Sequence, residues 1–234
     1  MWCLEAARSD SDGVQLSSRT ASLAVLGGTF DPIHLGHLQM AIEARELLGV
    51  DRVKLVPSWD SYHRGRPSTD PEIRAMMLKA ALAGVDGLEA DFTEHERKGP
   101  SYTVDTLTHF RDCYGVTCPI ILLLGEDAFA AIDTWKDWRR LTGLAHIAVV
   151  RRPGEGLDLE GLTRRFFDME LEQPEKLSES PFGHIVCIRT TPIGISATQI
   201  RTRVSKGLSI DFLVPERVNR LIKEKHLYLK EEVA

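Results

Sequence analysis

The chain has few of the features that mark several common classes of protein. Its 234 residues include four cysteines, with no CxxC pair and no His/Cys cluster at zinc spacing. This excludes a small disulfide- or metal-stapled domain and indicates reduced thiols. No run reaches the ~18 apolar residues of a membrane span, and the first twenty residues lack the apolar core of a secretory signal. We therefore expect a cytoplasmic protein with no membrane partner.

An excess of positive charge is missing as well. Lys and Arg number 29 against 34 Asp and Glu, a net charge of −5. A protein that tracks a nucleic-acid backbone usually carries a basic field, so we expect no nucleic-acid partner, although a local basic pocket for a small phosphate ligand stays possible. The hydrophobic share of 43% and charged share of 27% are those of an ordinary globular protein.

Strand and helix patterns alternate along most of the chain. Apolar runs predict strands at residues 23–26, 53–56, 88–92, 120–124, 147–150 and 185–188. Helical spacing begins at Leu35 and at Pro71, and it recurs at residues 104–113 and 128–141. Asp70 is the expected N-cap of the helix that begins at Pro71, and the Met76–Met77 pair is expected in the core. The pattern predicts an α/β fold, a Rossmann-like doubly wound parallel sheet with right-handed crossovers.

We expect one domain over residues 22–234, preceded by a flexible leader or extension at 1–21 and ending in a small helical portion at about 195–230. The all-apolar run at 120–124 suits a central strand buried on both faces. In such sheets ligands bind beyond the carboxyl ends of the strands. The loops after residues 26, 56, 124 and 150 are therefore where a site is expected.

The first candidate site lies between the first strand and the first helix, where residues 27–37 read GGTFDPIHLGH. Gly27 and Gly28 let a phosphate approach the backbone, Thr29 offers a hydroxyl, and the helix start supplies free N–H groups. In a helical first turn His34 and His37 would share a face and donate to phosphate oxygens. A tight turn with two satisfied histidines is the alternative. A metal site at the two histidines is disfavoured, because the segment lacks the carboxylate and the i, i+4 spacing of the common helical zinc motif. The absence of a GxGxxG fingerprint disfavours an ordinary Rossmann dehydrogenase.

The second candidate is the segment ISATQIR at residues 195–201. Ser196 is the expected N-cap of a helix that continues to Lys206, and Arg201 lies one turn further on. A helix N-terminus with hydroxyls and an arginine can bind an anion. Taken alone, the same pattern also fits a purely structural cap.

Together, the HxGH and ISxTxxR patterns of these two segments resemble the nucleotidylyltransferase superfamily, and within it the bacterial nicotinate-nucleotide adenylyltransferases. Further matching segments are GPSYTVDTL at 99–107, GED at 125–127, the Trp135–Trp138 region, RRPG at 151–154, FLVP at 212–215 and LY at 227–228. The resemblance implies transfer of AMP from ATP to nicotinate mononucleotide, giving nicotinate adenine dinucleotide and pyrophosphate.

The resemblance also implies roles for individual residues. The catalytic groups would be His34, His37 and Arg201. The ATP-binding residues would be Gly27, Gly28, Thr29, Phe30, His34, Gly36, His37, Gly125, Asp127, Ser196, Thr198 and Arg201. The residues that bind the nicotinate nucleotide would be Ser101, Tyr102, Thr103, Trp135, Arg152, His63 and Arg64. Mg²⁺ would accompany ATP, bound mainly through substrate phosphates with no dedicated protein site.

Several of these expectations have alternatives. Trp135 is expected to stack on the pyridine ring and Trp138 to be structural, although two tryptophans at this spacing often simply pack. A capping Thr103 would give a carboxylate a helix N-terminus on which to dock, which suits nicotinate better than uncharged nicotinamide. The usual Pro-Pro-His-Lys or Pro-Pro-His-Arg loop is replaced by residues 60–64, DSYHR, without either proline, so we expect a more mobile loop there.

Other functions remain open from the sequence. The acceptor could be nicotinamide mononucleotide or, less in keeping with the GPSYT segment, phosphopantetheine. A non-catalytic nucleotide-binding regulator is the alternative from another class, and intact His34, His37 and Arg201 argue against it. A tRNA-charging enzyme is disfavoured by the short acidic chain. A homo-oligomer is compatible with the sequence.

Overall fold

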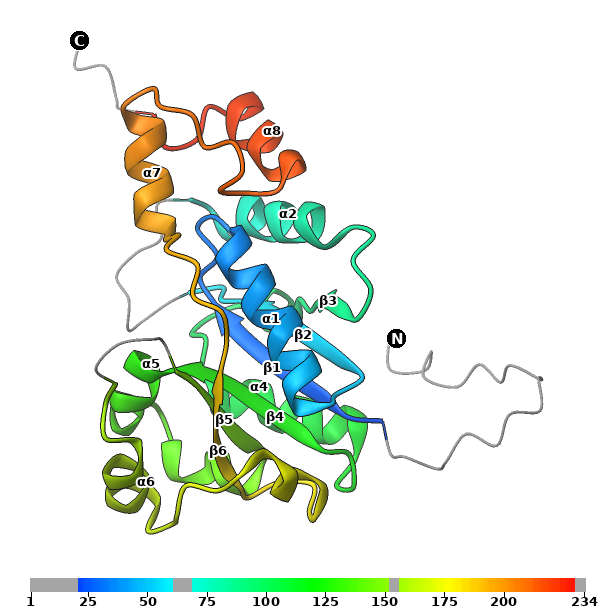
Figure 1. Ribbon diagram of the computed structural model, residues 1–234. Coiled ribbons are helices and arrows are strands. Elements are labelled where there is room, and N and C mark those ends of the chain that lie inside the picture. Colours follow the sequence, from blue (N-terminus) through cyan, green and yellow to red (C-terminus); the bar gives the residue numbers. More distant parts are fainter. Residues whose placement is uncertain (1–20, 61–68, 152–155, 230–234) are drawn as a thin grey trace, which may run out of the picture.

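The computed structural model describes residues 21–60, 69–151 and 156–229, which form a parallel sheet flanked by helices (Figure 1). In these residues the sheet has six strands in the order β3-β2-β1-β4-β5-β6, and all neighbouring strands are parallel. Their bounds are β1 (Leu23–Gly28), β2 (Arg52–Pro57), β3 (Leu88–Ala90), β4 (Ile120–Gly125), β5 (His146–Arg151) and β6 (Ile185–Arg189). Every predicted strand is present within two residues of its expected ends. The predicted α/β fold is confirmed.

Helices cover both faces of the sheet. Their bounds are α1 (Leu35–Leu48), α2 (Pro71–Leu82), α3 (Thr93–Arg97), α4 (Thr103–Tyr114), α5 (Glu126–Ala130), α6 (Leu159–Phe167), α7 (Ala197–Ser205) and α8 (Glu216–Glu224), with 3-10 turns η1 (Ile132–Thr134), η2 (Trp138–Gly143) and η3 (Pro174–Ser178). α1, α2, α7 and α8 pack on one face, and α4, α5, α6 and η2 on the other. Within the described ranges no helix is long and apolar enough to cross a bilayer.

The sheet separates two apolar layers, and β4 contributes to both. Ile121 and Leu123 point into the layer beneath α1, whereas Ile120, Leu122 and Leu124 point into the layer beneath α4. Successive side chains of a strand alternate between faces, so a strand buried on both sides must be apolar throughout. The expectation of a central strand at 120–124 is confirmed.

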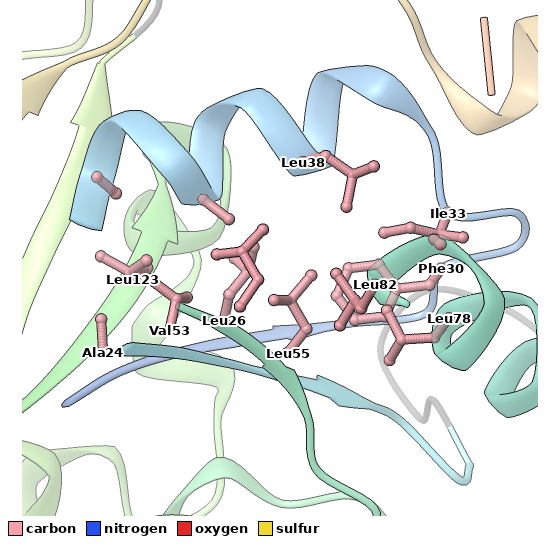
Figure 2. Packing of buried hydrophobic residues seen from close by; sticks show 14 of the residues in the cluster. Ala24, Leu26, Phe30, Ile33, Leu38, Val53, Leu55, Leu78, Leu82 and Leu123 are labelled. Atoms are coloured by element: carbon pink, nitrogen blue, oxygen red, sulfur yellow. The ribbon is translucent and has the colours of Figure 1, made fainter. Parts of the chain in front are cut away.

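The layer beneath α1 also fixes the loop that leaves β1. Figure 2 shows Leu38 of α1 above the strand side chains, and Phe30 and Ile33 from the loop beside Leu78 and Leu82 of α2. Both loop side chains are buried. The loop is therefore held by hydrophobic packing against α2 rather than by its own turn alone.

The strand order places the ends of β1 and β4 at the point where the connections change direction. From β1 the chain passes through α1 to β2, and from β4 it passes through α5 to β5 on the other face. Loops that diverge in this way leave a crevice beyond the carboxyl ends of the two strands. Figure 1 shows α2, α7 and α8 grouped at this end of the sheet, next to the start of α1.

The single helix expected at residues 128–141 is wrong. The structure has α5, η1 and η2 there, with an extended Trp135 (ψ 147°) and a left-handed Asp137 (φ 48°). A continuous helix would put positions 135 and 138 on one face. Instead Trp138 packs against Phe166 and Phe167 of α6, so tertiary packing overrides the helical spacing.

Two smaller expectations also fail, and a third is met. Met77 is fully buried, but Met76 is 45% exposed, because α2 turns only one of the two adjacent side chains toward the sheet. Asp70 is the N-cap of α2, as expected, although its side chain makes no capping hydrogen bond. Tyr102, not Thr103, is the N-cap of α4, and Thr103 is the first helical residue.

Candidate active site

Close packing between a glycine and a phenylalanine shapes the loop after β1. A Cβ at Gly28 would lie 2.8 Å from Cε1 of Phe30, so a larger residue does not fit. Phe30 is buried with a left-handed φ of 49°, which costs a non-glycine residue about 1–2 kcal/mol. Burial of its ring, worth roughly 1.5–3 kcal/mol, offsets that cost. At exposed Gly27 a Cβ would meet nothing within 4 Å, so ligand can approach the backbone there.

His34 and His37 stack on each other at the start of α1. Their ring centroids are 3.6 Å apart with 27° between the planes, and Phe30 meets His37 edge-on at 5.2 Å. His34 is the N-cap, with an extended backbone, rather than a helical residue as we expected. Gly36 makes room for its ring, because a Cβ there would lie 3.1 Å from Nδ1 of His34. The two imidazoles are thus presented side by side at the end of β1.

The imidazole of His34 is neutral at pH 7, because burial lowers its pKa to about 4. Its buried Nδ1 atom has no hydrogen-bond partner within the described parts of the chain. A neutral imidazole carries one N–H and one lone pair. His34 can therefore donate a hydrogen bond to an anionic oxygen, and that anion would in turn raise its pKa.

Helix α7 carries the second motif to the same loop. Ser196 is the N-cap, as expected, and its Oγ accepts a hydrogen bond from the N–H of Gln199 at 3.1 Å. Arg201 donates from Nη1 to the carbonyl oxygen of Asp31 at 2.7 Å and from Nη2 to Oγ1 of Thr198 at 3.2 Å. The two motifs that the sequence singled out are therefore in direct contact.

The carboxylate of Asp31 is engaged inside this loop. Asp31 is buried, and the hydroxyl of Tyr228 donates to its Oδ1 at 2.8 Å. Burial, followed by the negative charge of Asp31, raises the pKa of Tyr228, so the phenol remains a donor at physiological pH. The segment after α8 is thereby joined to the loop after β1.

The predicted nicotinate segment is bonded to the loop after β2. The Oγ of Ser101 accepts hydrogen bonds from the N–H groups of Trp59 at 2.9 Å and Asp60 at 3.3 Å. The N–H of Ser101 donates to the carbonyl of Asp60 at 3.2 Å. Tyr102 and Thr103 follow directly at the start of α4, so the positive end of the helix dipole lies at this segment.

Trp135 lies close to the same segment. Its neighbour Lys136 has its Nζ 4.6 Å from the ring centroid of Tyr102 and 3.2 Å from Oδ2 of Asp105. Trp135 itself is half-buried, whereas Trp138 is buried against α6. Trp138 is structural, as expected, and the stacking role of Trp135 stays a prediction.

The remaining predicted residues fall into two groups. Gly125 ends β4 and Asp127 is an exposed residue of the first turn of α5, so both lie at the carboxyl edge of the sheet. His63, Arg64 and Arg152 lie outside the described residues.

The sequence reasoning missed Arg74, a buried arginine of α2. Its guanidinium donates to the carbonyl oxygens of Thr29, Trp59 and Thr69. The sequence did contain a signal for this role. Position 74 lies three residues before Met77 and four before Leu78, so the arginine falls on the apolar face of the helix. An arginine on the apolar face of a helix points to a buried polar role.

Comparisons with known proteins identify the family of this chain. The model of the cytidylyltransferase-like family matches residues 25–203. A Chromohalobacter salexigens protein named "probable nicotinate-nucleotide adenylyltransferase" is 40% identical over 213 residues, which are 90% of this chain and 97% of that protein. A Methylococcus capsulatus protein of the same name is 40% identical over 210 residues, which are 89% of this chain and 100% of that protein.

Solved structures share the fold. Plasmodium falciparum nicotinic acid mononucleotide adenylyltransferase complexed with NaAD has a TM-score of 0.67 at 16% identity, covering 89% of this chain and 97% of that chain. The fold and the site define an enzyme of the cytidylyltransferase-like nucleotidyltransferase class. By its identity to relatives over nearly its whole length, the chain belongs to the nicotinate-nucleotide adenylyltransferase family.

Proposed function

We propose that the protein transfers AMP from ATP to nicotinate mononucleotide, forming nicotinate adenine dinucleotide and pyrophosphate for NAD biosynthesis. The observation that carries the proposal is the hydrogen bond from Arg201 to Asp31, because it brings the HxGH loop and the ISxTxxR helix to one site. The names of the relatives, which match over most of the chain, support the same reaction.

The chemistry requires positioned donors rather than a protein nucleophile. The phosphate of nicotinate mononucleotide is already ionised at pH 7, so its oxygen attacks the α-phosphorus of ATP in line while the bond to the pyrophosphate oxygen breaks. Negative charge must be stabilised on the equatorial and leaving oxygens. His34, His37 and Arg201 supply N–H donors for these oxygens, and no side chain of the protein is modified.

ATP is held from two sides. The main chain of the loop after β1 approaches the phosphates closely because Gly27 leaves open space. The residues in this group are Gly27, Gly28, Thr29, Phe30, His34, Gly36 and His37 between the end of β1 and the start of α1, Gly125 and Asp127 at the junction of β4 and α5, and Ser196, Thr198 and Arg201 from the cap and body of α7.

Mg²⁺ is carried mainly by the phosphates of ATP. Apart from the carboxylate of Asp127, the polar side chains proposed to bind ATP are imidazoles, hydroxyls and a guanidinium, whereas magnesium is usually held by carboxylates and phosphates and keeps several waters. The carboxylate of Asp31 is buried and engaged by Tyr228. When bound with ATP, Mg²⁺ neutralises phosphate charge.

The nicotinate half binds beside α4. Tyr102 and Thr103 lie at the start of a twelve-residue helix, where free N–H groups and the dipole favour a carboxylate. Trp135 stacks on the pyridine ring, and Ser101 shapes the segment through its bonds to the loop after β2. His63, Arg64 and Arg152 are further proposed contacts to the nucleotide. The reaction takes place in the cytoplasm, in keeping with the free thiols of Cys118 and Cys187.

Pyrophosphate release by the purified protein with ATP and Mg²⁺ tests the proposal. Nicotinate mononucleotide, nicotinamide mononucleotide and phosphopantetheine are supplied in parallel. We expect the highest kcat/KM with nicotinate mononucleotide. An equal or higher value with the nicotinamide compound would contradict the specificity, and ATP binding without any pyrophosphate release would contradict the enzymatic function.

A further inference from the structure

Arg74 of α2 is fully buried, with an exposed fraction of 0%, and three separate segments accept its hydrogen bonds. Nη1 donates to the carbonyl oxygen of Thr29 at 2.7 Å, Nη2 to that of Trp59 at 3.1 Å, and Nε to that of Thr69 at 3.2 Å. A guanidinium presents its N–H groups in a rigid planar fork. One side chain thus fixes three backbone positions relative to one another.

Two of these positions belong to the two halves of the proposed site. Thr29 lies in the loop that approaches ATP. Trp59 lies after β2, and its N–H is bonded to Ser101 in the segment proposed to bind nicotinate. The N–H of Ser58 also donates to the carbonyl of Gly28 at 2.9 Å. Arg74 therefore lies where the backbones of the ATP side and the nicotinate side meet.

The positive charge of Arg74 is influenced by a negative charge in the same loop. Burial lowers the pKa of this guanidinium, and the negative charge of Asp31 acts in the opposite direction. Arg201 binds the carbonyl of Asp31 from the outside and Tyr228 binds its carboxylate. The loop after β1 is held from α2, from α7 and from the segment after α8.

We propose that Arg74 is a positioning residue for adenylyl transfer, which sets the separation between the ATP loop and the nicotinate-binding segment. The proposal rests on the proposed function. In-line attack requires the reacting atoms at about 3–3.5 Å, and a 1 Å misplacement can cost ~10²-fold in rate. A lysine at position 74 keeps the charge but has no planar fork with which to bridge Thr29 and Trp59.

Arg111 of α4 is a matched control. It is 9% exposed, and its guanidinium donates to the carbonyls of Leu144, Gly115, Cys118 and Pro181. These acceptors precede β4, β5 and β6, at the amino ends of the strands and so at the opposite edge of the sheet from the site. Like Arg74, Arg111 is buried and donates hydrogen bonds to backbone carbonyl oxygens, but these carbonyls lie in neither the ATP loop nor the nicotinate-binding segment.

The test compares Arg74→Lys and Arg111→Lys with the wild type in steady-state pyrophosphate release and in thermal unfolding. We expect both variants to unfold at lower temperature. Only Arg74→Lys should lose kcat, by tenfold or more, with KM for either nucleotide changed less than threefold, since ground-state contacts remain and alignment is lost. The proposal is overturned if kcat of Arg74→Lys stays within twofold of wild type, or falls no further than that of Arg111→Lys.

A second measurement uses only the wild-type protein and requires no catalytic turnover. Amide hydrogen exchange measures how strongly the N–H groups of Ser58 and Trp59 are protected from solvent. These groups donate hydrogen bonds to the carbonyl oxygen of Gly28 and to Oγ of Ser101. We expect protection of both before any nucleotide is added, because both amides are hydrogen-bonded and Arg74 holds the adjoining carbonyl oxygens of Thr29 and Trp59. Exchange at unprotected rates that slows only after ATP addition would overturn the proposal. An inactive wild type with both amides protected would contradict the proposed function alone.

Discussion

Arg201 donates a hydrogen bond to the main-chain oxygen of Asp31 at 2.7 Å, across 170 positions of sequence. The contact joins a helix near the end of the chain to the loop after the first strand. Because the same guanidinium also bonds Thr198, it both anchors the loop and keeps a positive charge beside the proposed phosphate site.

Replacing Arg201 by Ala should therefore lower kcat/KM for ATP by about 10²-fold or more, since a lost charged donor costs roughly 3–4 kcal/mol in the transition state. Arg203, on the same helix, donates instead to the carbonyl of Ser209 at 2.8 Å. Arg203→Ala is the control and should keep most of the activity. Equal losses in the two variants, measured by pyrophosphate release, would remove Arg201 from the site.

His37→Ala should reduce kcat by about 10²-fold or more with the fold intact. His37 is half-buried, stacks on His34 and meets the edge of Phe30, so its removal leaves Phe30 packed against α2 and His34 against Gly36. Circular dichroism checks the fold, and initial rates at saturating substrates measure kcat. A kcat near the wild-type value would exclude His37 from the mechanism.

Trp135→Ala and Trp138→Ala should have opposite signatures. Loss of Trp135 should raise KM for nicotinate mononucleotide with little change in kcat, since stacking is present in ground and transition states alike. Loss of Trp138, which packs on Phe166 and Phe167, should lower stability by about 3–5 kcal/mol. Denaturant unfolding and KM measurements on both variants separate the two effects. An unchanged KM in Trp135→Ala would make that residue structural.

Adjacent glycines provide another matched pair. Gly28→Ala would drive a Cβ to 2.8 Å from Phe30, so we expect it to destabilise the fold and disturb the loop. Gly27→Ala meets nothing within 4 Å and should leave the unfolding temperature unchanged. If ATP approaches the backbone at this point, Gly27→Ala should still raise KM for ATP. A normal KM there would argue against close phosphate approach at Gly27.

Two buried histidines predict a loss of stability in acid. Burial lowers the pKa values of His34 and His146 to about 4, whereas the unfolded chain titrates near 6.5. Between these values the unfolded state binds more protons, so the stabilisation is complete above pH 6.5 and is lost as pH falls toward 4. The expected loss is about 2 kcal/mol per histidine at pH 5.

Urea unfolding at pH 7 and pH 5 measures this loss. His146 is the histidine remote from the site, with Nε2 2.9 Å from the carbonyl of Ser180 and Nδ1 accepting from the N–H of His184 at 3.0 Å. In His34→Gln the difference between the two pH values should shrink by about half, because His146 still titrates. No change in the difference would show that His34 does not titrate with a lowered pKa.

Much of this arrangement could be predicted from local pattern. Apolar runs placed all the strands of the described sheet, and the glycine–histidine segment lies at the end of β1 as expected. The Ser196 cap also has its predicted bond. These features depend on residues close together in sequence, and so neighbouring residue types are sufficient to specify them.

Other features depend on contacts that no local pattern contains. The break between α5 and η2 follows from the packing of Trp138 on α6. The bonds of Arg74 join three segments, and Tyr228 reaches Asp31 from 197 positions away. Each partner looks ordinary in its own segment, so only the folded chain shows that they meet.

The sequence by itself determined the parallel α/β fold, because apolar periodicity is local, and the two candidate anion-binding motifs, whose residues carry the resemblance to the family. The tertiary structure decided which side chains hold those motifs in register: Arg201 on Asp31, Tyr228 on the same aspartate, and Arg74 between Thr29 and Trp59. The physical reason is that a buried carbonyl or charge must find a partner wherever the packed chain brings one. Sheet topology determines which partners come within reach.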